Sequence, residues 1–345
     1  MSILNVFHQD AFSFTRITDA LRELKYTPSR IGQLGLFQTT SVDTLTVAIE
    51  KDKVQNQIIV AASPRGGPGQ TFGKNTRSLR SLAVPHFQVD DAIMADEVQQ
   101  MRAFGSETAV ERLQEKIADR AAEASQSFAL TEEFHRLSVI KSGKVLDADN
   151  ATVLFDYFKE FEDPAPSEID FDLGKSNPAE GALRKLCAGV VRQMAGILDG
   201  LPYRGLHAFC GDAFFDDLIA HPEVRETYKG YADASTLRTA YVDASGQQSS
   251  FGTFTFGGIT WENYRSGDTV KVETDKCHFV PLGVPGLFRT VYAPADYVDA
   301  VNTKGQRLYG KQWEMENGKG VNLEFQMNAL HYCTRPRVLI PGRRT

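Results

Sequence analysis

The feature that most constrains the fold is a long amphipathic helix predicted between residues 92 and 137. Apolar residues recur there every three or four positions, which places them in one stripe along a helix: Val110, Leu113, Ile117, Ala121, Ala124 and Phe128. From residue 106 to 137 the helix would be about 48 Å long, against a usual helix of roughly 11 to 12 residues. A helix of this length spans a whole small domain.

The outer face of this predicted helix is acidic, with five acids each four residues apart: Glu107, Glu111, Glu115, Asp119 and Glu123. Like charges at that spacing destabilise an isolated helix by roughly 0.2–0.5 kcal/mol per pair. The stripe is either a surface for a cationic partner or a solvated face. Because Arg112, Lys116 and Arg120 each precede an acid by three residues, the helix alone favours the solvated face.

The segment before the helix has the opposite charge. Apolar alternation predicts a hairpin with strands in 41–49 and 57–62, and a further strand over 77–88; the intervening segment 63–76 is rich in Gly and Pro. Residues 51–88 carry one acid and six bases, net +5, whereas residues 90–133 are net −7; the six bases are Lys51, Lys53, Arg65, Lys74, Arg77 and Arg80. A long loop with little apolar surface is more easily stabilised against another surface, which favours a partner.

The remaining segments predict a mixed α+β chain. A second hairpin is expected from 138–145 and 151–161, followed by a boundary at the Pro-rich 163–166. A helix is predicted to start with Asn177 as cap and Pro178 at its first position, and to end at Gly200. A strand over 206–210, a short helix near 212–220 and strand segments through 251–264 and 278–282 follow. A closing strand over 321–340 is expected beside the hairpin at 138–161.

Composition limits the class of protein. With 345 residues, 42% hydrophobic and 24% charged, the chain is expected to be soluble and globular, with room for two domains. No apolar run of membrane-spanning length and no secretory signal is visible, so folding in a cytoplasm is expected. The four cysteines form no CxxC pair and predict buried, reduced thiols. A net charge of −6 argues against a surface that binds nucleic acid tightly, so any polyanion near the protein is expected to be enclosed by it rather than bound to it.

No catalytic, cofactor or metal site is predicted. The one sequence similar to a phosphate-binding loop, residues 67–74, has Pro68 at the first glycine position and Asn75 in place of the magnesium-binding Ser or Thr. Possible metal ligands come close together only at Cys277 with His278 and at His331 with Cys333, and two ligands do not make a site. A nucleotide-dependent enzyme that uses Lys74 is the alternative from another class.

Five short motifs, in order along nearly the whole chain, resemble a known family. They are Ser63-Pro-Arg-Gly66, Val84-Pro-His-Phe87, Ala293-Pro-Ala-Asp-Tyr297, Val301-Asn-Thr-Lys-Gly305 and Thr334-Arg-Pro336. Together with the order of arm, hairpin, long helix, hairpin, α+β domain and closing strand, they resemble the lambda-type major capsid protein E family of tailed bacteriophages. None of the motifs is catalytic, so the resemblance depends on their order and spacing.

The resemblance implies the Hong Kong 97 type capsid fold, in the α+β class. Its parts would be an N-terminal arm (1–40), an extended loop (41–90), the spine helix with the peripheral domain (91–166), an axial domain (167–320) and a C-terminal strand returning to the peripheral domain (321–345). In this family the extended loop lies over the neighbouring subunit. The six loop bases and the five helix acids would then be intersubunit contacts, and no residues for the founding member's lysine-to-asparagine crosslink are identified here.

The resemblance also implies a structural, non-enzymatic function. Many copies would form hexamers and pentamers of an icosahedral shell in the virion, assembled in the host cytoplasm around double-stranded DNA without sequence-specific binding and without contact to a membrane. A separate scaffolding protein, a portal protein and a decoration protein are the further partners considered. The alternative within the fold is an encapsulin-type bacterial compartment, which neighbouring portal and terminase genes would exclude.

Overall fold

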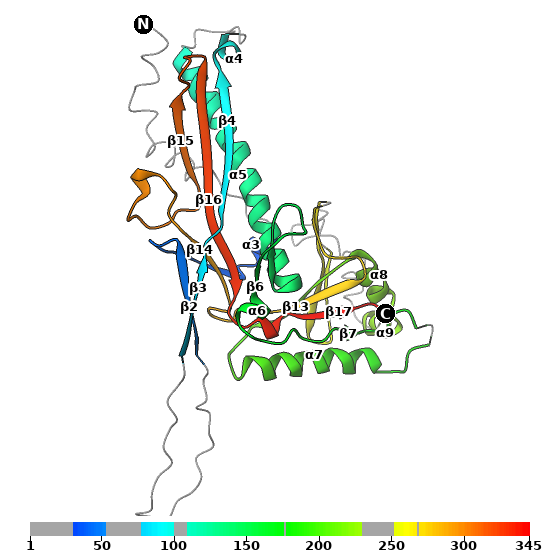
Figure 1. Ribbon diagram of the computed structural model, residues 1–345. Coiled ribbons are helices and arrows are strands. Elements are labelled where there is room, and N and C mark those ends of the chain that lie inside the picture. Colours follow the sequence, from blue (N-terminus) through cyan, green and yellow to red (C-terminus); the bar gives the residue numbers. More distant parts are fainter. Residues whose placement is uncertain (1–29, 53–76, 100–108, 176, 230–251, 268) are drawn as a thin grey trace, which may run out of the picture.

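The computed structural model describes residues 30–52, 77–99, 109–175, 177–229, 252–267 and 269–345. Its described part has three regions (Figure 1): an elongated sheet with a long helix, a lateral region with a second sheet, and a hairpin that projects beyond both. The C-terminus lies in the lateral region, at the end of the second sheet. Helices and strands are both present, as the predicted α+β class requires.

The elongated sheet is built on the longest strand of the described chain, β16 (Gly320–Cys333). One side of β16 pairs with β4 (His86–Met94), in a register that places Gly320 opposite Met94. The other side pairs with β15 (Tyr309–Glu314) and β14 (Phe288–Tyr292), and β1 (Phe37–Ser41) adds to β14 in parallel. The predicted closing strand is therefore confirmed over most of its length. Its main-chain partners are β4, β14 and β15, and it contacts the segment at 138–161 through the Tyr157 hydroxyl, which donates to His331 O (2.6 Å).

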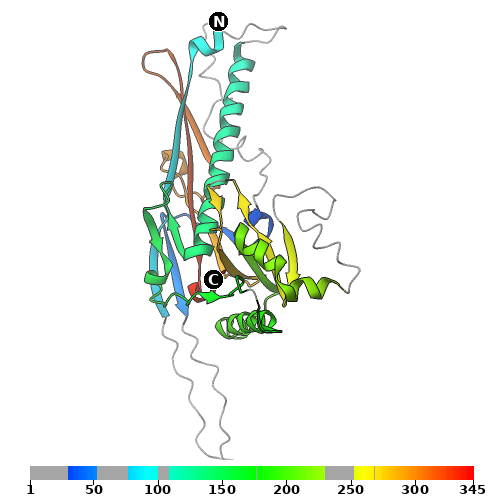
Figure 2. The same cartoon turned by 90° about the vertical axis from the view of Figure 1, so that its right-hand side faces the viewer.

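The long helix is α5 (Ala109–Ser142), which lies along this sheet (Figure 2). The predicted stripe is confirmed from Ile117 onward, because Ile117, Ala121, Ala124 and Phe128 are all buried in one cluster with β4 and β16 side chains. The side chains of Val110 and Leu113 lie outside the described residues. The amphipathic pattern thus located the helix and its buried face correctly.

The predicted limits of this helix differ from the structure at both ends. Residues 92–94 belong to β4, a short helix α4 (Ala95–Gln99) follows, and residues 100–108 lie outside the described chain. At the other end, 138–142 are helical rather than the start of a strand. The helix ends at Gly143, whose φ of +62° suits glycine. Val139 and Ile140 are β-branched and so favour a strand on local propensity. In the structure both are completely buried, and this packing stabilises the helical conformation instead.

The lateral sheet has β10 (Ile259–Asn263) parallel to β8 (Gly205–Cys210), with antiparallel neighbours on both sides. Its order is β7-β17-β13-β8-β10-β9. The remaining strands of this sheet are β7 (Ile169–Asp170), β9 (Thr253–Phe256), β13 (Lys276–Leu282) and β17 (Ile340–Arg343). Aromatic rings fill its core, where Trp261 contacts Phe171, Phe214 and Phe279 at centroid distances of 5.5–6.0 Å.

Three helices accompany this sheet: α7 (Ala182–Leu198), α8 (Asp212–Ala220) and α9 (Pro222–Lys229). Helix α8 has the limits that the sequence predicts, but α7 begins at Ala182 rather than next to Asn177. Its N-terminus is capped from a distance, since the Glu223 carboxylate of α9 accepts hydrogen bonds from Leu183 N (3.0 Å) and Arg184 N (3.2 Å). A cap that is 40 residues away in sequence cannot be found in the local pattern.

Two hairpins extend from these layers. The projecting one pairs β2 (Thr46–Asp52) with β3 (Arg77–Ala83) rather than with the predicted strand 57–62, and residues 53–76 lie outside the described chain. The predicted strand 77–88 is split between β3 and β4. The second hairpin, β5 (Lys144–Leu146) with β6 (Val153–Asp156), confirms the predicted pairing over a shorter length. The remaining short elements are α3 (Arg30–Gln33), α6 (Tyr157–Glu160), β11 (Arg265–Ser266), β12 (Val270–Lys271), η2 (Val298–Ala300) and η3 (Pro336–Val338).

Candidate functional site

The exposed side of α5 and the adjoining β4 form one acidic surface, which we call the acidic face. Glu115, Asp119 and Glu123 are exposed on α5, and Asp90 is exposed on β4. Glu111 lies in α5 with a side chain that the structure does not describe, and Glu107 lies outside the described residues. Three of the five predicted acids therefore lie on an exposed surface.

The bases of α5 neutralise this face only in part. Arg120 Nη1 lies 3.2 Å from Glu123 Oε2 on the helix itself, and Arg120 and Lys116 also pair with acids of neighbouring elements. Arg120 Nε lies 3.2 Å from Asp91 Oδ2 on β4, and Lys116 Nζ lies 3.1 Å from Glu97 Oε2 on α4. The hydrogen bond from Lys116 lowers the pKa of Glu97 below its ordinary value. Asp91 and Glu97 thus add two acids that the helix pattern did not include. The acidic face keeps an excess of negative charge.

Three of the six predicted bases lie on the described strands of the projecting hairpin. Lys51 and Arg77 are in β2 and β3, with side chains that the structure does not describe, and Lys53, Arg65 and Lys74 lie outside the described residues. Arg80 is described, and it forms an ion pair with Glu162 and lies 3.9 Å from Glu160 in the segment around α6. Arg80 therefore connects the base of the hairpin to its own chain.

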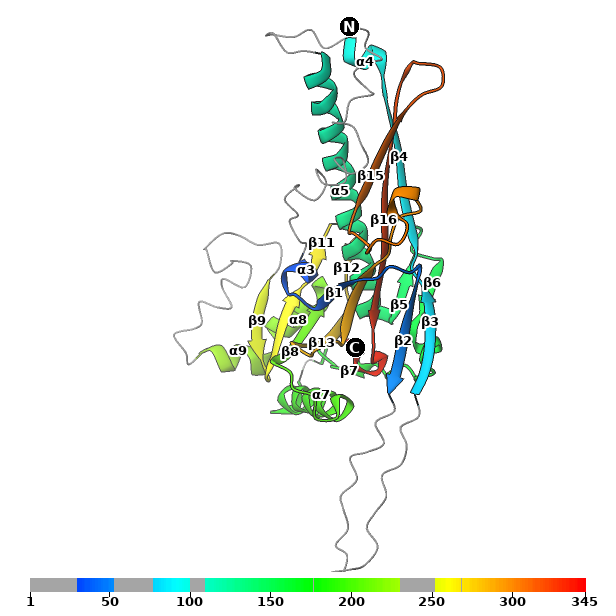
Figure 3. The ribbon, with the colours of Figure 1, turned by 90° about the vertical axis from the view of Figure 1, so that its left-hand side faces the viewer.

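The hairpin and the most acidic part of α5 lie at opposite ends of the molecule. In all three ribbon views the hairpin points away from the body at one end, whereas the first turns of α5 lie at the other end (Figures 1, 2 and 3). The Glu115 and Asp119 carboxylates cannot meet the far end of the hairpin within one chain.

A second group of functional residues, which the sequence analysis missed, is a set of three fully buried carboxylates at the junction of α5 with both sheets. Glu133 of α5 accepts hydrogen bonds from the Ile31 backbone N–H (2.8 Å) and from the Tyr264 hydroxyl (2.6 Å). Glu132, one residue earlier, accepts from Tyr292 and from Arg307 Nε (3.0 Å). Glu132 follows Phe128 by four residues, so an acid on the apolar stripe was the signal that could have identified this junction.

The third carboxylate, Glu262 of β10, holds the N-terminal end of the described chain. Arg30 Nε and Arg30 Nη2 each donate to it at 2.7 Å, and His207 Nε2 lies 3.0 Å away. Burial raises the pKa of Glu262, but His207 and Arg30 offset this and lower the pKa below its ordinary value. We call Arg30, Ile31, Glu133 and Glu262 the α3 clasp, since they fasten α3 to both α5 and the lateral sheet.

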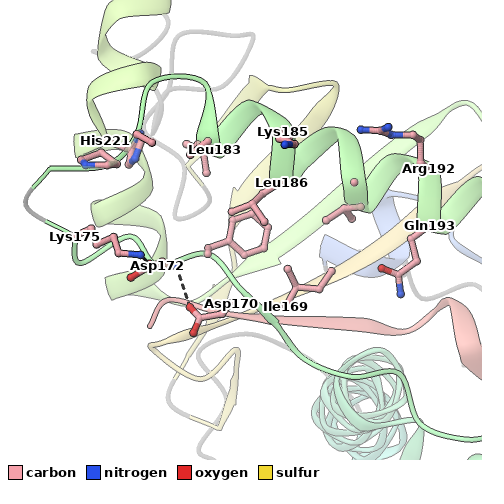
Figure 4. Close-up of a pocket in the computed structure, with 16 residues that line it drawn as sticks. Ile169, Asp170, Asp172, Lys175, Leu183, Lys185, Leu186, Arg192, Gln193 and His221 are labelled. Carbon is pink, nitrogen blue, oxygen red and sulfur yellow. Dashed lines mark hydrogen bonds and ion pairs between the residues drawn. The ribbon is translucent and has the colours of Figure 1, made fainter.

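The structure also contains an open pocket of about 800 Å³ between α7 and β7 (Figure 4). Ile169, Leu183 and Leu186 line it with apolar atoms, while Lys185 and Arg192 are polar residues of its wall. Among the described residues, no group of three or more His, Cys, Asp or Glu side chains is arranged to hold a metal ion.

The possible metal ligands noted in the sequence are core residues. Cys277, His278, His331 and Cys333 are all buried, and burial raises the pKa of Cys333 to about 12. All four cysteines are free and buried, which confirms the predicted thiols. Of the helices in the described chain, none has the length and apolar character needed to cross a membrane.

The fold as a whole is similar to solved phage capsid proteins. The crystal structure of the putative capsid protein of a prophage from E. coli CFT073 matches with a TM-score of 0.61 at 12% identity, covering 97% of this chain and 99% of that one. The capsid structure of cyanophage P-SCSP1u matches with a TM-score of 0.50 at 13% identity, covering 93% and 90%. These similarities confirm the Hong Kong 97 type fold, which is the fold class of phage capsid proteins.

The sequence comparisons identify the family. The family described as phage major capsid protein E matches residues 13–344, and the chain therefore belongs to that family. The major capsid protein of Pseudomonas phage KPP10 is 26% identical over 97% of both chains, and that of Salmonella phage Felix O1 is 25% identical over 96% of both. The chain is a structural protein of the phage capsid, and these phage relatives favour this reading over the encapsulin alternative.

Proposed function

We propose that copies of this chain assemble through hexamers and pentamers into an icosahedral shell, and that the basic hairpin of one copy contacts the acidic face of the next. The observation that supports this proposal is that the acidic face and the described part of the projecting hairpin, strands β2 and β3, lie at opposite ends of one molecule. Because the hairpin segment is basic in sequence and its described strands point away from the acidic face of the same chain, a second copy is the simplest partner for both. Contacts between two different surfaces of identical subunits generate closed rings when the rotation closes, as capsomers require.

The proposal assigns a part to each region. Residues 41–90 would be the extended loop, 91–166 the spine helix with the peripheral domain, and 167–320 the axial domain around the capsomer centre, with 1–40 as an arm and 321–345 as the closing segment. The shell would be assembled in the host cytoplasm and would enclose double-stranded DNA without reading its sequence. A scaffolding protein, a portal protein and a decoration protein are its proposed partners.

Negative-stain electron microscopy of the purified full-length chain tests this function. We expect spheres, tubes or capsomer rings, and we expect their yield to rise when the other head proteins of the phage are present. A chain that remains a compact monomer at high concentration, with and without those proteins, would contradict the proposal. Packaged double-stranded DNA in the spheres would support a phage shell, whereas shells filled with enzyme cargo would support the encapsulin alternative.

A further inference from the structure

The connection between β14 and β15 forms a compact projection, residues 293–308, which we call the outer knob. It is longer than the roughly 12–15 residues beyond which an irregular loop in a compact domain usually has a function. Two valines lie at its surface: Val298 is 85% exposed and Val301 is 63% exposed. Figure 3 shows the knob, with its short η2 helix, beside the base of β15.

The outer knob is held rigidly by contacts of its own. Ala295, Tyr297 and Ala300 form a small buried cluster with Tyr309 of β15. Successive turns are closed by hydrogen bonds from Ala300 N to Tyr297 O (2.9 Å) and from Thr303 N to Ala300 O (3.2 Å). The exposed valines are therefore presented by an ordered support.

Gly305 fastens the knob to the elongated sheet. A Cβ at this position would lie 2.2 Å from the Tyr292 carbonyl oxygen, so only glycine allows this close backbone approach. Gly305 N donates to Val42 O (2.8 Å), which connects the knob to the segment after β1. The position of the valines relative to the sheet is thereby fixed.

The exposed surface of the knob carries two acids and one base beside the valines: Asp296, Asp299 and Lys304. Asp296 accepts a hydrogen bond from Gln326 Nε2 (2.6 Å) of its own chain, whereas Asp299 makes, within the described chain, only a long contact of 3.9 Å with Lys311 Nζ. An apolar centre with charges of both signs beside it can be self-complementary, because two copies related by a two-fold axis can place Asp299 of each near Lys304 of the other. The knob also lies on the opposite flank from α7 and the lateral sheet (Figure 1).

We infer that the outer knob forms a two-fold contact with the outer knob of a second copy of this chain, with Val298 and Val301 at its centre. The inference rests on the proposed shell and adds a second kind of contact to it. The basic hairpin and the acidic face would join different surfaces within a capsomer, whereas the knobs would join identical surfaces of neighbouring capsomers. Burial of the valines between two ordered supports would stabilise the contact through the hydrophobic effect.

Cysteine crosslinking tests this contact directly. We would prepare shells from Val298→Cys and from Val301→Cys and oxidise them with copper phenanthroline. A disulfide needs Cα atoms within roughly 7 Å, so a bond between the same residue of two copies forms only where those residues face each other. We expect covalent dimers on a non-reducing gel for at least one of the two variants. The native cysteines are buried, which keeps the background low.

A matched control is Val153→Cys, which places a thiol at another exposed valine, on β6. We expect it to give less than about one tenth of the knob dimer, because an isolated exposed valine needs no partner. Shells that form normally but give no knob dimer, or no more dimer than the control, would overturn the inference and leave the proposed function intact. Failure of the unaltered chain to form any shell would instead count against the proposed function.

A charge exchange gives a second, independent test in the Val301→Cys background. Asp299→Lys alone and Lys304→Asp alone should each slow crosslinking, because each places like charges opposite one another. The double exchange should restore the rate at least half-way, since it recreates an acid opposite a base. If the double exchange is slower than both single changes, the two residues do not face each other and the two-fold arrangement is wrong.

Discussion

Reversal of Glu115 and Asp119 to Lys is expected to leave the subunit folded and to reduce the yield of shells by about tenfold or more at low salt. Both side chains lie exposed on the acidic face, so their replacement leaves the core unchanged. The loss should be largest near 0.01 M salt, where the Debye length is about 30 Å. Sedimentation would measure the yield of particles, and circular dichroism would confirm that the subunit is folded.

A control with the same change in net charge reverses Glu180 and Glu226, which are exposed near α7 and in α9. This control variant should assemble nearly as well as the unaltered chain.

Reversal of Lys74 and Arg77 to Glu should also reduce assembly. Arg80 is left unchanged because it pairs with Glu162 of its own chain. Combining the two reversals should recover part of the loss. A combined variant that is no better than the worse parent would remove this charge pairing, although the family assignment would stand.

Replacement of Arg30 by Ala is expected to lower the free energy of unfolding by about 3–5 kcal/mol, since it removes the two hydrogen bonds and the permanent positive charge that Arg30 gives the buried Glu262 carboxylate and leaves only His207 beside it. Thermal unfolding of unassembled subunits would measure the loss as a lower Tm. Arg343→Ala is the matched control: Arg343 pairs with Asp170 at 2.7 Å, but both side chains are more than 40% exposed, so the change should be below about 1 kcal/mol.

The contribution of the α3 clasp to the stability of the folded subunit should decrease as the pH is lowered. The pKa of Glu262 is lowered in the folded state, so the clasp contributes fully above the ordinary glutamate pKa of 4.5 and loses its contribution as the pH falls through the folded value. Arg30→Ala with Glu262→Gln should be more stable than Arg30→Ala alone, and its stability should vary less in acid. Equal losses for Arg30→Ala and Arg343→Ala at neutral pH would contradict the importance of the clasp.

The sequence predicted those features of the fold that depend on local periodicity. The stripe through Ile117 and Phe128 located the long helix because both the pattern and the burial extend over many turns. Its ends were predicted less well. Val139 and Ile140 favour strands locally, and only tertiary burial, which a single sequence does not display, keeps them in α5.

Features that depend on distant partners could not be predicted. One partner of β16 is β4, more than 200 positions earlier, and the local pattern of neither strand indicates the other. The partners of the buried carboxylates are equally hidden: the place of Glu132 on the apolar stripe could have marked it as buried, but the local pattern does not indicate that Tyr292 and Arg307 contact Glu132 or that Ile31 contacts Glu133. The acidic face was predicted from charge spacing, but the contributions of Asp91 and Glu97 required the packing of β4 and α4.

The most direct test of the proposed assembly is a cryo-electron microscopy reconstruction of the shell at a resolution that traces the backbone. We expect the β2–β3 hairpin of each subunit to lie over α5 and β4 of its neighbour in the same capsomer, with residues 53–76 near Glu115 and Asp119. A shell in which the hairpin contacts another surface, while the acidic face remains open to solvent, would contradict it.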